Sequence, residues 1–258
     1  MNTGTIRTRK FVNRITVVVL AVIVSLLCTA CPQNGGGAPD NNTVSYAQVS
    51  FVQLDEYLKA TASDNTVKYI EVTGLTKDAV KGTATTASPL GEILKAHSSK
   101  KVALKFGGKI EGLTDMFCCF NGCTNLIYAP AIPTGITDMA YCFTDCTNLV
   151  EAPEIPEGVT DISGCFNNCK KLTQTLIIPA SVSHMYSCFS DCISLKTVIL
   201  KCNYNPEKDK WLAPSFKEAF GGCTNLIVGG IKVPAGQLAT YQANATLMSV
   251  TADKFAAE

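Results

Sequence analysis

Two cysteines four residues apart recur along the chain, in the stretches CFNGC, CFTDC, CFNNC and CFSDC. Paired thiolates could bind zinc, and in an oxidising compartment the thiols could join as disulfides. Structural zinc sites usually draw four ligands from two such pairs, and the two histidines, His97 and His184, fall outside the repeated offsets. The spacing therefore predicts no metal site. The third interpretation is packing, because a free thiol behaves as a small hydrophobic group.

Geometry favours packing over disulfides, which stay an alternative. Stacked coils would bring equivalent Cα atoms about 4.8 Å apart, inside the window of roughly 4.4–6.8 Å that disulfides need. Parallel side chains would, however, disfavour the S–S dihedral of about 90°. Ala219 takes the first cysteine position in the fifth copy, which indicates selection for size. The two predicted buried ladders are Cys119, Cys142, Cys165 and Cys188, and Cys123, Cys146, Cys169, Cys192 and Cys223.

No arrangement of residues predicts catalysis. The motifs GxSxG, HExxH, GxxxxGK[ST] and GxGxxG do not occur in the sequence. A nucleophilic cysteine must be partly exposed in an electropositive niche, whereas these cysteines are predicted to lie in the core. We therefore expect no catalytic residue, no cofactor and no enzymatic activity. An enzyme would need a polar, pocket-lining cluster that the sequence does not show.

A repeat of 23 residues organises the cysteine-containing region. Phenylalanine marks each copy, and an insertion before the fifth copy lengthens the last interval to 31 residues. Each unit reads as a helical or 3₁₀ turn followed by a short extended piece that ends at proline. One such unit cannot bury its own apolar side, but stacked units can, which predicts a solenoid. The predicted core phenylalanines are Phe120, Phe143, Phe166, Phe189 and Phe220.

The pattern CFxxCxxL…IPxxVTD resembles the treponemal-type leucine-rich repeat of BspA-like bacterial surface proteins, clearly so over residues 113–236. This resemblance implies an α/β repeat fold: a right-handed leucine-rich-repeat solenoid with short strands and short helical or 3₁₀ turns. It also implies surface antigens and adhesins that contact host matrix proteins, host cells or other bacteria.

The regions on either side lack the motif. Residues 46–112 contain LDEYLKA followed by VKYIEVTGL, and LGEILKAH followed by KKVALKF, and each pair reads as a helix leading into a strand. We expect degenerate N-terminal units that cover the open end of the core and pair with its first strand. A separate small domain is the alternative. Residues 237–258 are predicted to form a helical C-terminal cap.

The N-terminus predicts export. Arg7, Arg9, Lys10 and Arg14 precede an apolar run over residues 16–28. A run of about 13 apolar residues is too short for a membrane span and suits a signal peptide, here residues 1–30. The sequence before Cys31 resembles a bacterial lipoprotein signal, with Cys31 as the lipidated residue and residues 31–45 as a flexible tether. The alternative is an ordinary cleaved signal that leaves Cys31 a free thiol.

Charge and location limit the class of partner. The formal net charge is +1, and removal of residues 1–30 with their four positive charges leaves −3. Nucleic acid is excluded as an expected partner, because phosphate binding needs clustered Lys and Arg. We expect a protein anchored by lipid to the bacterial envelope, at the outer-membrane surface, with an extracellular protein or a host cell as its partner. A structural envelope protein facing the periplasm is the alternative, and the sequence specifies no oligomer.

The candidate binding face consists of the variable positions that follow each repeated leucine, since their chemistry changes from copy to copy. A second candidate is the insertion before the fifth copy, with its two large aromatics, because aromatics are enriched at binding hot spots. The alternative is that the tryptophan simply packs over the solenoid edge. The candidate residues are Tyr128, Glu151, Gln174 and Lys196 after the leucines, and Tyr204 and Trp211 in the insertion.

Overall fold

The computed structural model describes residues 44–207 and 214–258. The expectations for the signal peptide, for lipidation at Cys31 and for Trp211 lie outside these residues. These described residues belong to one compact unit. Its strands are β1 (Ala47–Ser50), β2 (Lys68–Thr73), β3 (Val102–Phe106), β4 (Leu126–Tyr128), β5 (Leu176–Ile178), β6 (Val198–Leu200), β7 (Ile231–Val233) and β8 (Phe255–Ala257). Its α-helices are α1 (Leu54–Ala60), α2 (Pro89–Ala96) and α3 (Leu238–Ala243), and its 3₁₀ turns are η1 (Phe51–Gln53), η2 (Lys77–Ala79), η3 (Ala235–Gln237) and η4 (Ala252–Lys254).

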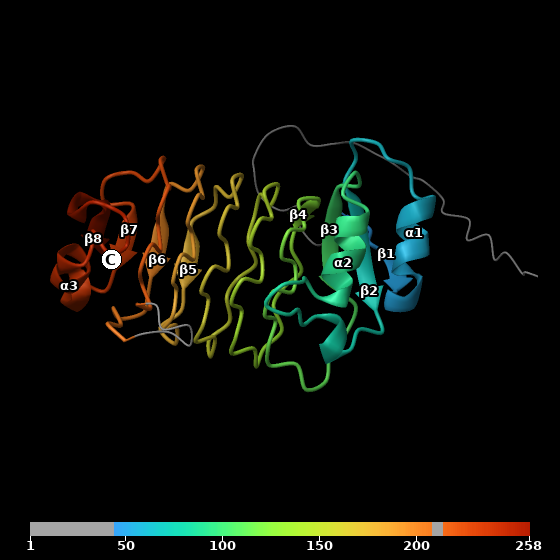
Figure 1. The fold of residues 1–258 in the computed structure, drawn as a ribbon, viewed down its shortest axis with the longest axis horizontal. Coiled ribbons are helices and arrows are strands. Elements are labelled where there is room, and N and C mark those ends of the chain that lie inside the picture. Colours follow the sequence, from blue (N-terminus) through green and yellow to red (C-terminus); the bar gives the residue numbers. More distant parts are fainter. Residues whose placement is uncertain (1–43, 208–213) are drawn as a thin grey trace, which may run out of the picture. The chain divides into compact units, whose positions relative to one another are not determined.

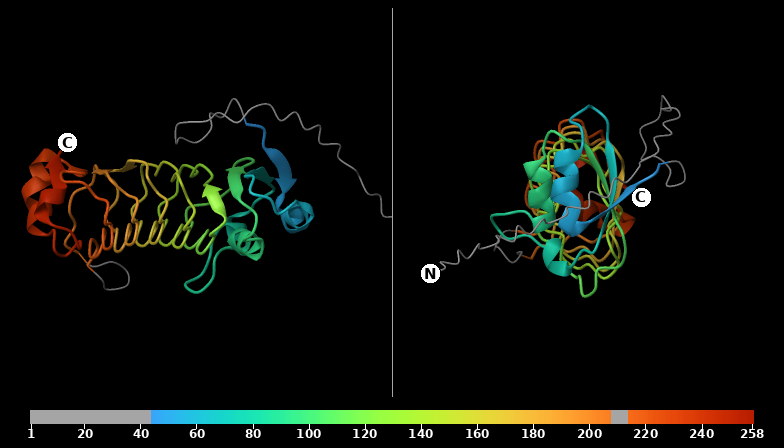
Figure 2. Two further views of the ribbon diagram at one scale, coloured as in Figure 1. Left: turned by 90° about the horizontal axis from the view of Figure 1, so that it is seen from above. Right: turned by 90° about the vertical axis from the view of Figure 1, so that its right-hand side faces the viewer.

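The strands form two parallel sheets, in the orders β1-β2-β3-β4 and β5-β6-β7-β8. Strands that are consecutive in the chain are neighbours in each sheet, so the coils follow one another in chain order (Figure 1). Figure 2 shows the same coils from above and from one end. Parallel strands joined by one coil each fit the expected α/β repeat fold. The handedness and the capping roles of the two ends stay predictions.

The predicted helical or 3₁₀ segments of the repeats are wrong. Between residues 113 and 230, the described part of the chain contains tight turns and no helix. The Cys142 N–H donates to the Met139 carbonyl, as a turn would, but the Phe143 N–H donates to the Cys165 carbonyl of the next coil at 2.8 Å. Alternate backbone N–H groups therefore donate to carbonyls of the next coil. Because these groups are not free to bond within their own coil, a continuous helix cannot form.

Residues in the left-handed conformation enforce this alternation. Tyr141 has a φ of 57° and Asp145 one of 60°, and the residues one coil later, Gly164 and Asn168, have 60° and 61°. Such values interrupt a right-handed helix. The Asn168 Nδ2 donates to the Asp145 Oδ1 at 2.6 Å, so the left-handed positions also support each other between coils. Cys142, Phe143 and Cys146 follow Met139 by 3, 4 and 7 residues, a spacing that suits a helix. A chain of turns produces this apolar spacing here.

The helices and strands predicted in residues 46–112 are confirmed. The Ser88 side chain accepts a hydrogen bond from the Gly91 N–H, and Pro89 begins α2, which are local signals for a helix start. β3 pairs with β4, the first strand of the repeats. The sheet thus continues from this region into the repeats. Residues 237–258 contain α3 as expected, and also β8, which the sequence pattern did not predict.

We expect Gly91→Ala to lower the free energy of unfolding by about 1–3 kcal/mol, although alanine is the better helix former. A Cβ at Gly91 would press on the carbonyl oxygen of Cys119 and lie 2.9 Å from the Cβ of Ala87. Gly236→Ala is the matched control, because a Cβ there meets nothing within 4 Å. Urea unfolding of both variants measures the difference. Equal stabilities would show that α2 does not pack tightly on the repeats.

Candidate functional site

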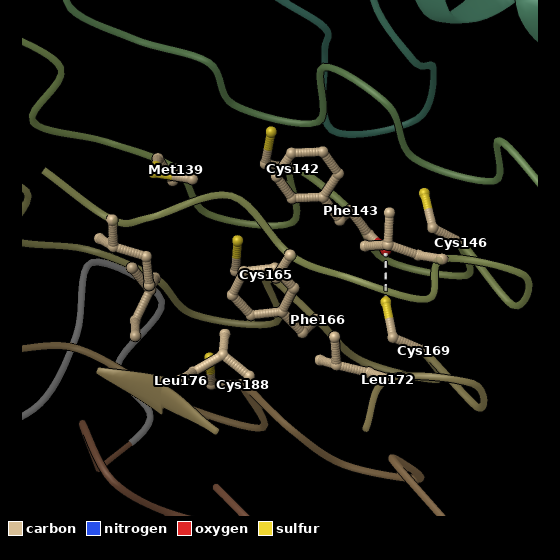
Figure 3. Packing of buried hydrophobic residues seen from close by; sticks show 14 of the residues in the cluster. Met139, Cys142, Phe143, Cys146, Cys165, Phe166, Cys169, Leu172, Leu176 and Cys188 are labelled. Carbon is tan, nitrogen blue, oxygen red and sulfur yellow. Dashed lines mark hydrogen bonds between the residues drawn. The ribbon is translucent and has the colours of Figure 1, made fainter. Parts of the chain in front are cut away.

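The structure places all nine ladder cysteines as free thiols, with eight buried and Cys223 partly buried. Figure 3 shows Cys142, Cys165 and Cys188 on one side of the phenylalanine rings, and Cys146 and Cys169 on the other. The cysteines of each ladder occupy the same position in successive coils. Because neighbouring coils pack closely, this position suits a small apolar side chain. This is the geometry that the packing interpretation requires.

The second ladder also contributes hydrogen bonds. The Cys146 Sγ donates to the Phe120 carbonyl at 3.2 Å. The Cys169 Sγ donates to the Phe143 carbonyl at 3.2 Å, and Figure 3 shows this hydrogen bond. Cys192 and Cys223 repeat the contact with the carbonyls of Phe166 and Phe189. Alanine would fill part of this space but could not donate. The sequence reading of these cysteines as fillers therefore missed their role as donors.

The thiols are poorly suited to nucleophilic or ligand chemistry. Burial raises the pKa of Cys223 to about 12 and that of Cys118 to about 11. Burial also raises the pKa of Cys146 and Cys169 well above the ordinary value. The thiolate is the reactive form, so little of it exists near neutral pH. Within residues 44–207 and 214–258, no group of three or more His, Cys, Asp or Glu side chains could hold a metal ion.

Turns that begin at an aspartate stack from coil to coil. The carboxylates of Asp115, Asp138 and Asp161 each accept a hydrogen bond from the amide two residues later, at 2.7 to 2.9 Å. Isolated parallel bridges join these residues from coil to coil, and His184 continues the series after Asp161. These hydrogen bonds show that the three aspartates close the turns that follow them.

A proline-rich coil separates the two sheets. Residues 151–157 read EAPEIPE, and Pro153 and Pro156 have no N–H to donate to a ladder. A single bridge position, between Tyr128 and Glu151, is found between this coil and β4 in the described residues. In the described chain, no backbone hydrogen bond links residues 152–157 to residues 174–179. The sheet is therefore interrupted here, and β5 begins the second sheet with one edge open.

A groove lies at this interruption, and we call it the proline groove. It encloses about 830 Å³, and a smaller hollow of about 360 Å³ adjoins it between the proline coil and β5. Its walls come from the coils of β3 and β4, from the proline coil, from Gln174 just before β5 and from Tyr46 just before β1. The proline groove is lined by Tyr46, Leu104, Lys105, Tyr128, Ala129, Ala131, Ile132, Thr134, residues 151–157 and Gln174.

Three of the six candidate binding residues, Tyr128, Glu151 and Gln174, meet in the proline groove. Lys196 is exposed but does not line it. Tyr204 lies against the core, with its ring 5.2 Å from that of Phe216. The structure therefore gathers part of the predicted face and separates the rest.

Sequence reasoning missed other groove residues, above all Tyr46, Lys105, Glu154 and Glu157. The two glutamates could have been found, because one repeat copy carries two prolines and three glutamates in seven residues. Tyr46 could not be found, since it is brought to the groove from before β1.

The groove carries more negative than positive charge. Its one lysine, Lys105, lies 3.7 Å from the Glu71 carboxylate and 5.9 Å from the centre of the Tyr46 ring. Glu154 and Glu157 are exposed, and neither forms an ion pair with any residue that the structure describes. Glu154 and Glu157 thus present carboxylates that no cation of the described residues neutralises.

Comparison with known families gives one finding. A family model described as the BspA type leucine rich repeat region matches residues 117–210, with six copies. The resemblance read from the repeats is thereby confirmed. Neither the curated proteins nor the solved structures yielded a significant match. In the part of the chain that the structure describes, every helix is too short or too polar to cross a membrane.

Proposed function

Because residues 117–210 form a BspA-type leucine-rich repeat region, we propose that this protein is a surface binding protein rather than an enzyme. In this proposal the chain is exported and held by a lipid on Cys31 at the outer surface of the bacterial envelope. It acts as an adhesin or surface antigen, and its partner is a protein of the host matrix, of host cells or of other bacteria.

The proline groove is the observation that supports this role most directly. Stacked repeats create extended surfaces suited to macromolecules. In this groove Tyr128 supplies an aromatic ring, Glu151 a carboxylate and Gln174 an amide, over an apolar floor. A mixed apolar and polar lining of this kind is typical of binding sites, and tyrosine is frequent at their hot spots.

Binding assays with the compact unit, residues 37–258, test the proposal. We expect saturable binding to immobilised extracellular-matrix proteins or to intact host cells. Tyr128→Ala should weaken it about tenfold, in the range of an interface hot spot. Tyr186→Ala is the matched control, since Tyr186 is also partly exposed and does not line the groove.

Location is tested separately by protease treatment of intact cells. A surface protein is degraded while a periplasmic marker is protected. A folded unit that binds no matrix protein and no cell, together with full protection from protease, would contradict the proposal. That combination would support a structural envelope protein facing the periplasm.

A further inference from the structure

The dimensions of the proline groove suit a short extended peptide. Its walls come from the coils of β3 and β4, from the proline coil and from Gln174, which lies just before β5. Neighbouring coils in a sheet are about 4.8 Å apart, so three intervals span roughly 14 Å. An extended chain advances about 3.3 Å per residue, and about four residues would fill this length.

The floor of the groove is apolar, and three of the polar side chains that line it are carboxylates. Ala129, Ile132 and Ala152 line the floor, and the carboxylates of Glu151, Glu154 and Glu157 come from the proline coil. The lysine is already next to Glu71. A ligand with positive charge would therefore be complementary to the groove, and an acidic one would be repelled.

The backbone of the proline coil adds further acceptors. In the described chain, the carbonyl groups of residues 153–155 accept no hydrogen bond from other protein groups, because the ladder to β5 is not formed. Ile177 of β5, on the other side of the smaller hollow, is 56% exposed. Peptide N–H groups and the head groups of Lys or Arg could donate to the carbonyls while their aliphatic stems cover apolar surface.

We propose that the proline groove binds an extended basic segment of about four residues within a protein partner. A Lys or Arg of the segment lies between the carboxylates of Glu154 and Glu157, and the backbone of the segment crosses the apolar floor beside Tyr128. This inference rests on the proposed binding function and names the class of partner.

Fluorescence anisotropy with a labelled Gly-Arg-Lys-Arg-Gly peptide tests the inference on residues 37–258. Peptides in which Glu-Asp-Glu or Gln-Asn-Gln replaces the basic residues serve as charge controls. We expect saturable binding of the basic peptide alone, weakened by added salt because the carboxylates are partly exposed. The double variant Glu154→Gln with Glu157→Gln should bind about fivefold more weakly, since each exposed ion pair changes an affinity by only a small factor.

The matched control is Glu111→Gln, an exposed glutamate that pairs with Lys109 and does not line the groove. It should bind the peptide as the parent does. Circular dichroism confirms that each variant is folded. Equal binding by the parent and the double variant would overturn the inference, and so would equal binding of basic and acidic peptides.

The two proposals can fail independently. If the unit binds matrix proteins or cells but not the basic peptide, the groove inference is overturned and the binding function stands. If the peptide binds as expected but no macromolecule or cell does, the groove inference stands and the adhesin proposal fails. If nothing binds to folded protein, both are overturned.

Discussion

Raising the pH from 8 to 10 is expected to unfold the repeat region. Burial raises the pKa of the ladder thiols, so the folded state keeps their protons while the unfolded state loses them above its pKa of about 9. The contribution of these thiols to the free energy of unfolding is therefore fully present below pH 9. It is lost as the pH rises from 9 toward the pKa of the thiols in the folded state. The buried ladder thiols with a raised pKa are Cys123, Cys142, Cys146, Cys165, Cys169, Cys188 and Cys192.

The expected size of this effect is large because the thiols act together. At pH 10 each one lowers the free energy of unfolding by about 1.4 kcal/mol, so the seven remove about 10 kcal/mol. That is comparable to the whole stability of an ordinary domain, about 5–15 kcal/mol. Urea unfolding followed by circular dichroism, in a phosphine reductant at pH 7, 8, 9 and 10, measures the loss.

A variant with fewer thiols is the matched control. Ala219 already occupies the first ladder position in the fifth copy, so Cys142→Ala, Cys165→Ala and Cys188→Ala together follow the chain's own pattern. Between pH 8 and pH 10, the free energy of unfolding of this variant should fall by about 4 kcal/mol less than that of the parent. If the triple variant does not fold, Cys165→Ala alone should lose about 1.4 kcal/mol less. A parent whose stability stays constant over this range would contradict protonated, buried thiols.

Phe166→Ala is expected to lower the free energy of unfolding by about 3–5 kcal/mol. The Phe166 ring is fully buried and lies between two others, with centroids 5.6 Å from Phe143 and 5.7 Å from Phe189. The column of parallel rings runs through five coils (Figure 3 shows two of them). Removing one ring leaves a cavity with a ring on each side. The backbones of the neighbouring coils cannot move together to close this cavity without breaking the hydrogen bonds between coils.

Phe117→Ala provides the comparison within the same repeats. Its ring is only partly buried and meets the Tyr141 ring edge-on at 5.9 Å. We expect a cost of about 1 kcal/mol, because less apolar surface is lost and no enclosed cavity forms. Urea unfolding at pH 7 gives both values. Similar costs for the two variants would mean that the column of rings is not the centre of the core.

The sequence by itself determined the repeat and its core. Four phenylalanines at equal intervals, with cysteines and leucines at fixed offsets, predict which side chains stack, and the structure buries them. The helices α1 and α2 were also readable, because helix starts depend on neighbours in the chain such as Ser88 and Pro89.

The conformation of the repeats was decided only by the fold. Apolar residues spaced by 3, 4 and 7 suit a helix and suit a chain of turns equally well. The Phe143 N–H is used by the Cys165 carbonyl, 22 residues further along, and that bond removes the helical alternative. Gly91 is a second example, since its lack of a side chain is explained by the carbonyl of Cys119 and not by helix propensity.

The proline groove likewise depends on tertiary structure. The sequence shows that Pro153 and Pro156 cannot donate to a ladder, but it does not show which surface opens as a result. That surface exists because stacking brings Tyr46 and Gln174, far apart in the chain and on different coils, to the same groove. Repeats fix what each coil buries through local spacing, whereas a binding surface is set by contacts between coils.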